Sequence, residues 1–223
     1  MRQTGRGGRR ARAVLAIVTS LVLAGCQSPS GHSTPTPTPS VTSSAGYSTA
    51  DWATQVATNG RRLGAVGDKR IRITVYQVAT APAPTASVMV DPTDGAPVIA
   101  KGDRLVVLRY VVTNISTDPI NLGIGTVAIT ARYPDWPWEQ GLIGVRAPQL
   151  MAQKKAPTSP FRAGTQRPPY VLEPGSSFMV GQNAPYETAE ELQLTAKVVV
   201  SDDSGSDDAS LSWTVEGSVH LDQ

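Results

Sequence analysis

The apolar residues of this chain recur at every second position in several separate stretches, which is the spacing of β-strands with one buried face. In residues 70–75, the side chains of Ile71, Ile73 and Val75 alternate with polar ones. Residues 192–200 repeat the alternation over a longer stretch. Because successive side chains of a strand point to opposite faces, this spacing predicts half-buried strands and argues against a fold built from amphipathic helices.

Further stretches extend this pattern. Residues 105–114 (LVVLRYVVTN) are apolar at odd and even positions alike, so we expect a central strand that is covered on both faces. Residues 120–133 contain two more strand-like pieces, and residues 209–215 alternate again after DDSGSDDA, a sequence typical of a hairpin turn. With 20 glycines and 18 prolines among 223 residues, the chain is predicted to be an all-β, antiparallel β-sandwich.

The first 25 residues have the organisation of a secretory signal. Five arginines and no acid occupy residues 1–12, and an apolar run follows from Ala13 to Ala24. Twelve helical residues cover about 18 Å, whereas the hydrocarbon core of a bilayer is about 30 Å thick, so this run is short for a membrane span. A basic segment followed by a short apolar run predicts export from the cytoplasm.

The end of this signal resembles the lipobox of bacterial lipoproteins, and the resemblance is carried by Leu23, Ala24, Gly25 and Cys26. It implies that the peptide is cut before Cys26 and that this cysteine receives a diacylglycerol thioether, which would anchor the chain on the outer face of the cell membrane. The alternative is an ordinary secretion signal. Arg9 and Arg10 also hint at twin-arginine export, but the residues after them match that signal poorly, so Sec export is expected.

Removal of the signal also changes the charge and exposes a linker. The five arginines leave with it, which lowers the formal net charge from +2 to −3, so nothing indicates a nucleic-acid partner. Of residues 27–46, 14 of 20 are Ser, Thr or Pro, a composition that stays extended rather than folding into a core. At about 3.1 Å per residue, this linker spans roughly 60 Å.

The chain is therefore expected to comprise five consecutive parts. They are a lipoprotein signal peptide (1–25), the lipidated cysteine with its linker (26–50), a transition segment (51–68) with a short helix near 52–57, a β-sandwich domain (69–217), and a tail (218–223). The sandwich is expected to carry a Pro-rich, basic insertion near residues 133–170, which departs from a compact sandwich.

Two motifs resemble a known family. The stretch from Gly102 to Leu122 (GDRLVVLRYVVTNISTDPINL) and the turn Leu172-Glu173-Pro174-Gly175 are similar to patterns in secreted Gram-positive β-sandwiches. These are the immunoglobulin-like extracellular domains typified by the mycobacterial immunoprotective antigen, many of them lipoproteins of unknown function. The resemblance covers residues 69–200. It implies an immunoglobulin-like fold and an extracytoplasmic location, and it implies no catalytic residue.

Residues 140–172, called here the basic insertion, are a candidate binding surface. They contain no acid in a chain whose mature form is net acidic, and five prolines. A local positive patch can dock an anionic lipid, a cell-wall polymer or an acidic protein face. The alternative is a solvated loop. Its basic residues are Arg146, Lys154, Lys155, Arg162 and Arg167.

Residues 133–139 are a second candidate surface, because three aromatic side chains and two acids lie within seven residues. The aromatic residues are Tyr133, Trp136 and Trp138, and the acids are Asp135 and Glu139. Flat apolar rings beside carboxylates suit a sugar or a peptide. The two acids also allow a remote hydrolase reading, which needs two carboxyl groups at a defined separation. The alternative is that the tryptophans cap the open end of the core.

The turn between the last two strands offers a weak calcium site, since carboxylate oxygens are suitable ligands. Its acids are Asp202, Asp203, Asp207 and Asp208. The spacing lacks that of an EF-hand, and clustered Asp around glycine is also ordinary turn chemistry. No metal or other cofactor is therefore expected.

Taken together, these features predict a lipid-anchored, extracytoplasmic β-sandwich that binds a protein or a cell-envelope component and is not an enzyme. The chain has two histidines and one cysteine, too few for most nucleophilic or metal-dependent chemistry. The first alternative is a lipoprotein that binds a small molecule, a sugar or a peptide, beside Trp136 and Trp138. The remote alternative is an envelope hydrolase.

Overall fold

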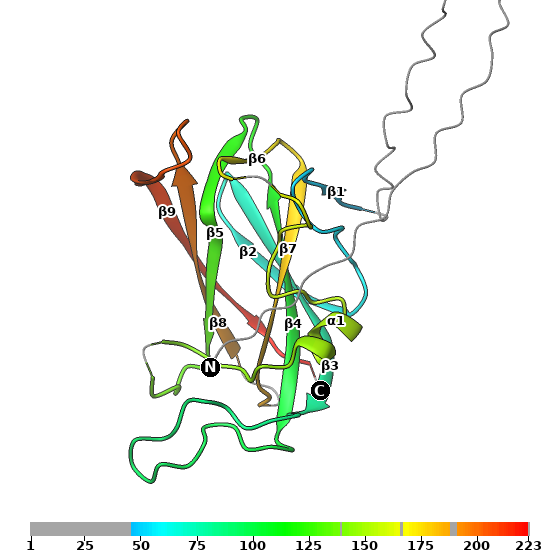
Figure 1. Cartoon of the computed structure of the whole chain (residues 1–223), viewed down its shortest axis with the longest axis vertical. Coiled ribbons are helices and arrows are strands. Elements are labelled where there is room, and N and C mark those ends of the chain that lie inside the picture. The colour runs from blue at the N-terminus through cyan, green and yellow to red at the C-terminus, as the bar shows by residue number, and fades with distance from the viewer. Residues whose placement is uncertain (1–45, 139, 166, 188–190, 223) are drawn as a thin grey trace, which may run out of the picture. The chain divides into compact units, whose positions relative to one another are not determined.

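Two β-sheets packed face to face form the domain, so the all-β sandwich expected from the sequence is confirmed (Figure 1). The computed structural model describes residues 46–138, 140–165, 167–187 and 191–222. The predicted signal peptide, Cys26 and most of the predicted linker lie outside the described residues.

The larger sheet has five strands in the order β1-β7-β4-β3-β2. Neighbouring strands are antiparallel, except that β1 pairs with β7 in parallel. The bounds of these strands are Ser48–Thr49 for β1, Ser176–Pro185 for β7, Arg104–Asn114 for β4, Ile71–Pro82 for β3 and Arg61–Gly67 for β2. The strand predicted to be central, 105–114, is the middle strand of this sheet.

The smaller sheet has four antiparallel strands in the order β6-β5-β8-β9. Their bounds are Tyr170–Leu172 for β6, Ile120–Arg132 for β5, Glu191–Ser201 for β8 and Asp207–His220 for β9. The predicted hairpin between residues 192–200 and 209–215 is confirmed as the β8–β9 pair. The two strand-like pieces of 120–133 are one strand, interrupted by a bulge between Leu122 and Val127.

The main core lies between the sheets. Alternate residues of β4, among them Leu108 and Tyr110, face the fully buried Leu192 and Ala196 of β8 within one apolar cluster. The hydroxyl of Tyr110 donates to Oε1 of Gln182, and burial raises the pKa of this phenol well above its usual value. Because every second side chain of a strand points to the same side, one face of each strand contributes to the apolar layer between the two sheets.

The outer face of the larger sheet is covered as well, which explains why β4 is apolar on both faces. Residues 83–103 and the basic insertion cover Leu105, the insertion also covers Val107, and residues 47–57 cover Val111. The middle of this cover contains the fully buried Arg109. A single sheet face in water would leave these side chains exposed, so the covering segments are part of the fold.

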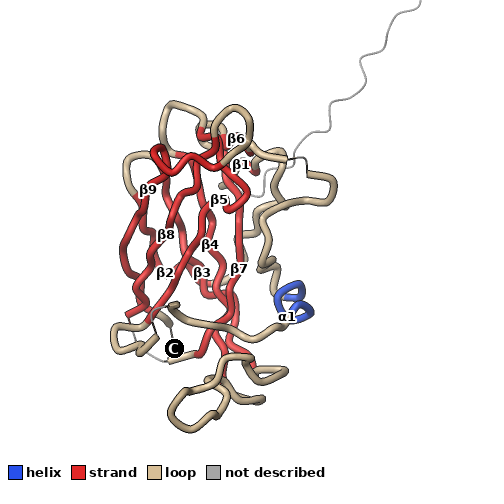
Figure 2. The backbone as a smooth tube through the Cα atoms, turned by 60° about the vertical axis from the view of Figure 1, so that its left-hand side comes forward, coloured by secondary structure: helices blue, strands red, loops and turns tan. Residues whose placement is uncertain are grey.

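The basic insertion is not structureless. It contains the helix α1 (Pro148–Gln153), which begins with a proline at its first position and buries Met151 against the sheet. Figure 2 shows α1 beside β7. Within the described part of the chain, no helix is long and apolar enough to cross a membrane.

The expected domain boundaries are wrong at both ends. The sandwich begins before residue 69, because β1 and β2 lie within the expected linker and transition segment, and no helix forms at 52–57. At the other end, β9 continues to His220. The Asp222 carboxylate forms an ion pair with Arg61, and the Asp222 amide donates to Oε1 of Gln77. Long-range pairing, which local sequence does not reveal, incorporates both segments.

The two ends of the sandwich differ in what they carry. Gly46, which the predicted linker precedes in the sequence, is the first described residue and lies close to the first residues of β7, because Ser48 pairs with Ser176. We call this the linker-proximal end, and the other the distal end. The distal end contains Pro185, the last residue of β7, about 30 Å along the strand from Ser176 at about 3.3 Å per residue.

Candidate functional site

A long connection between β3 and β4, residues 83–103, projects beyond the distal end, and we call it the finger (Figures 1 and 2). Internal hydrogen bonds hold it in shape. The backbones of Ser87 and Ile99 are hydrogen-bonded, and so are those of Met89 and Val98 and those of Asp91 and Ala96. Ser87 Oγ donates to Met89 O at 2.7 Å. The finger is therefore an ordered projection, whose conformation is fixed by its own hydrogen bonds.

The finger presents apolar side chains to solvent. Val88 is 96% exposed and Val90 is 49% exposed. Most large aliphatic side chains of a folded domain are buried, so an ordered segment that displays two valines is a typical feature of an interaction site. The sequence analysis did not single out this segment. The available signal was the apolar triplet Val88-Met89-Val90 inside a loop rich in Pro, Gly and Asp.

The aromatic segment, residues 133–138, lies at the same end as the finger. The Tyr133 hydroxyl donates to Pro185 O at 2.7 Å, and the Tyr186 amide donates to Arg104 O, where the finger ends and β4 begins. The end of β7 thus joins the two segments. We call the finger and the aromatic segment together the distal surface.

Two of the three aromatic side chains of this segment, Tyr133 and Trp136, contribute to the packing of the domain. Tyr133 is buried, and Trp136 packs edge-on against Trp138 with ring centroids 4.9 Å apart. Nε1 of Trp136 donates to Gly141 O at 2.7 Å. The alternative that these rings cap the open end of the core therefore describes Tyr133 and Trp136. Trp138 remains half-buried and Asp135 is exposed. Glu139, the second acid of the hydrolase alternative, lies outside the described residues.

The five basic residues of the insertion do not form one patch. Arg146 lies near the finger, and Lys155 lies at the end of α1, where its carbonyl accepts a hydrogen bond from Arg109. Arg162 and Arg167 line a pocket at the linker-proximal end. Lys154 is half-buried at the end of α1. The insertion runs along the whole length of β7, so its charges are spread over separate surfaces.

Arg109 links the two segments that cover the larger sheet. Nη1 donates to Asn59 Oδ1 at 2.9 Å and to Lys155 O at 3.1 Å, and Nη2 donates to Asn59 O. Nε has no hydrogen-bond partner among the described residues, and no described carboxylate forms an ion pair with the guanidinium. Burial lowers the pKa of this group. Its hydrogen bonds hold residues 54–59 against the end of α1.

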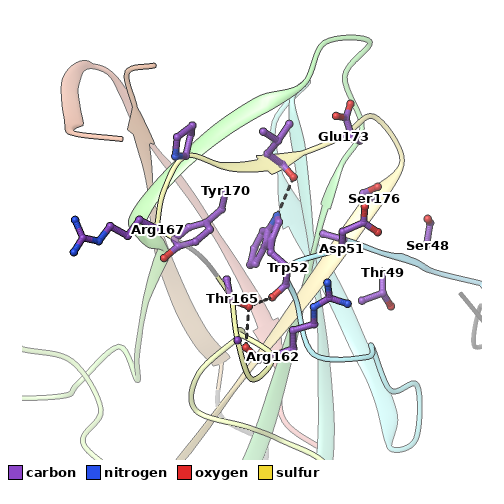
Figure 3. Close-up of a pocket in the computed structure, with 14 residues that line it drawn as sticks. Ser48, Thr49, Asp51, Trp52, Arg162, Thr165, Arg167, Tyr170, Glu173 and Ser176 are labelled. Carbon is purple, nitrogen blue, oxygen red and sulfur yellow. Dashed lines mark hydrogen bonds between the residues drawn. The ribbon is translucent and has the colours of Figure 1, made fainter. Parts of the chain in front are cut away.

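The pocket at the linker-proximal end has a volume of about 610 Å³ and mixed charge (Figure 3). Trp52 lies in its middle, where Nε1 donates to Val171 O and the ring packs on Tyr170 with centroids 5.4 Å apart. Arg162 points toward Thr49, whereas Arg167 points away to the other side. Two carboxylates, of Asp51 and Glu173, also line the pocket. The pocket is open and has a mixed polar and apolar lining, with side chains of both charge signs.

The acidic turn does not gather ligands for calcium. Oδ1 of Asp202 accepts hydrogen bonds from the Ser204 amide and hydroxyl, and Oδ1 of Asp208 accepts the equivalent pair from Ser210. These bonds to serine lower the pKa of both carboxyls. Among the described residues, no three acidic, histidine or cysteine side chains converge as metal ligands would. Asp202 therefore shapes the turn between β8 and β9, and Asp208 shapes the start of β9. Asp203 and Asp207 lie next to them in the sequence.

The comparisons with known proteins add no name to this arrangement. No protein-family model, curated protein or solved structure that was searched matches the chain.

Proposed function

We propose that this chain is a lipid-anchored, extracytoplasmic β-sandwich without catalytic activity, which binds another protein of the cell envelope through its distal surface. The observation that carries the proposal is the exposure of Val88 at 96% on an internally hydrogen-bonded finger. Burial of a valine side chain in an interface contributes about 2 kcal/mol. A partner that covers Val88 and Val90 gains this free energy without first having to order the finger.

The position of the finger supports the same proposal. The linker joins the domain at Gly46, so the opposite end of the sandwich is the part furthest from the attachment point. A tether of up to roughly 60 Å leaves that end free to meet another molecule. The finger also carries Asp91, Asp94 and Asp103 against Lys101, a balance that disfavours contact with an anionic bilayer.

The anchor is proposed from the lipobox, Leu23 to Cys26. Two acyl chains hold a protein stably on a membrane. We expect Cys26→Ser to abolish lipidation and to move most of the protein from the membrane fraction to the medium, or to leave it as unprocessed precursor. Fractionation with intact-mass spectrometry measures both. Unaltered membrane association of a processed Cys26→Ser chain would contradict the anchor.

The absence of catalysis is proposed from the residue inventory. The chain has one cysteine, which belongs to the lipobox, and two histidines. One of these, His220, lies in the last strand opposite Glu191, and the other lies in the linker. The proposal thus leaves no cysteine nucleophile and no histidine pair for general acid–base chemistry. The resemblance to immunoglobulin-like lipoproteins, which implies no catalytic residue, agrees with it.

In-cell crosslinking of the anchored chain, followed by mass spectrometry, tests the proposed function. We expect one dominant envelope protein to be captured by the anchored form, and the Cys26→Ser form to serve as the control for membrane proximity. Failure to capture any reproducible protein would count against a protein-binding role.

A second candidate function is small-molecule binding in the linker-proximal pocket, favoured by its volume of about 610 Å³ and by the central Trp52. We propose this pocket for the small-molecule alternative, in place of the surface beside Trp136, because the ring of Trp136 packs on Trp138 and its Nε1 donates to Gly141 O. If envelope sugars or short peptides bind there, we expect a rise in melting temperature and a change in tryptophan fluorescence, both weakened by Arg162→Ala. A ligand whose effects survive Arg162→Ala does not bind this pocket.

A further inference from the structure

Two grooves flank residues 146–148, beside the base of the finger. One, of about 470 Å³, lies between the end of β3 and the exposed side of α1, and its lining includes Pro82, Pro84 and Leu150. The other, of about 640 Å³, reaches from Val88 to Met151 and the backbone of β7. Both are lined by Arg146, Ala147 and Pro148. The grooves therefore adjoin each other along this short segment.

The lining of the two grooves includes a positively charged side chain, Arg146, and no negatively charged one. Arg146 is exposed and forms no ion pair with any described residue. Neither groove has an acid in its lining, and the whole insertion, residues 140–172, contains none. An exposed guanidinium between two largely apolar grooves favours a partner that supplies a carboxylate, since arginine binds carboxylates with two parallel hydrogen bonds.

The polar groups along the first groove suit a peptide backbone. Gln149 and Gln153 are four residues apart on α1, so their side chains lie on the same face of the helix, and both line the groove. Neither side chain has a described hydrogen-bond partner, and each amide can donate and accept. Two adjoining grooves with amides beside them match an extended segment better than a compact ligand.

We infer that the paired grooves bind an extended segment of a partner protein in which an acidic residue is flanked on each side by apolar residues. The acid pairs with Arg146, and the apolar side chains enter the two grooves. This inference rests on the proposed function, because it names the chemistry of the partner that the distal surface meets. Val88 borders the second groove, so the segment and the finger belong to one contact.

The test uses a displayed library of random 12-residue peptides, selected on the full-length chain purified in detergent. We expect the enriched peptides to share an Asp or Glu between apolar residues, and a synthetic copy to bind Arg146→Glu at least tenfold more weakly in fluorescence anisotropy. The matched control is Lys197→Glu, which reverses an exposed positive charge on the outer face of β8, away from both grooves, and should leave the affinity unchanged. Changing the acid of the peptide to Lys should restore binding to Arg146→Glu.

Three results would overturn the inference: enrichment without an acid, equal binding by Arg146→Glu, or no enrichment at all. Arg146→Ala and melting curves of each variant show whether a loss comes from the charge or from misfolding. In-cell crosslinking separates this inference from the proposed function. If Val88→Asp abolishes capture and Arg146→Glu does not, the proposed function stands and the inference is wrong, whereas capture by both variants contradicts both.

Discussion

Replacing Arg109 is expected to destabilise the domain strongly, by about 3–5 kcal/mol in Arg109→Ala. Truncation removes a fully buried side chain from the outer face of β4 and leaves a cavity beneath the two covering segments. It also removes the hydrogen bonds to Asn59 and Lys155, and bonds from a charged donor contribute about 1.5–3 kcal/mol each. Chemical denaturation measures the loss as a change in the free energy of unfolding.

The variant Arg109→Met separates the hydrogen bonds from the packing, since methionine fills much of the same space. Its loss is expected to be smaller, about 1–3 kcal/mol, because the cost of burying an unpaired cation disappears together with the bonds. In both variants, protease cleavage should begin in residues 54–59 and near Lys155, the two segments that the guanidinium joins. A methionine variant as stable as the native chain would show that the hydrogen bonds of Arg109 to Asn59 and Lys155 do not stabilise the domain.

Introducing charge at the tip of the finger is expected to abolish partner capture without unfolding the domain. In the double variant Val88→Asp, Val90→Asp, two exposed side chains change, so the melting temperature should move by less than about 2 °C. The binding free energy becomes less favourable for two reasons: the apolar surface of two valines is no longer buried, and two carboxylates must be desolvated. We therefore expect capture to fall by at least tenfold. Crosslinking yield in cells, normalised to the amount of anchored protein, measures the effect.

A matched control is available at the other end of the domain. Ile124 is 67% exposed on the bulge of β5, next to the linker-proximal start of that strand. The variant Ile124→Asp makes the same kind of change in exposed apolar surface, and capture should be retained. Equal loss of capture in both variants would indicate a general effect of surface charge rather than a site at the finger.

The strands that carry a local pattern could be predicted from the sequence. Alternation identified residues 71–75 of β3, and the two-faced apolar run of β4 predicted a central strand, because each follows from which faces of a strand are buried. The β8–β9 hairpin followed from the turn sequence between them. In each case the signal lies within about ten residues.

The segments that depend on distant partners were missed. The strand β2 (RRLGAVG) has no clear alternation, and it becomes a strand because Gly64 and Gly67 allow close packing against Val219 and the backbone of Ile71. The dipeptide β1 pairs with β7 across more than a hundred residues of sequence. Local sequence does not specify such pairings, since tertiary packing selects them.

The candidate sites were identified only in part for the same reason. The clustering of aromatic residues in the aromatic segment is visible in the sequence, but the sequence could not show that Tyr133 is buried in the core or that Nε1 of Trp136 donates to a backbone carbonyl. The basic insertion looked like one patch because its charges are close in sequence. The structure spreads Arg146 and Arg162 to opposite ends of β7, and it makes the finger, which carries few charges, the more exposed apolar surface.

The most direct test of the central claim is site-specific photocrosslinking in living cells, with p-benzoylphenylalanine placed at residue 88 of the anchored chain. A matched probe at Lys197, an exposed residue on the outer face of β8, reports proximity without contact at the finger. The account predicts one discrete adduct with an envelope protein from position 88 and none from position 197. The same adducts from both positions, or none from position 88, would contradict it.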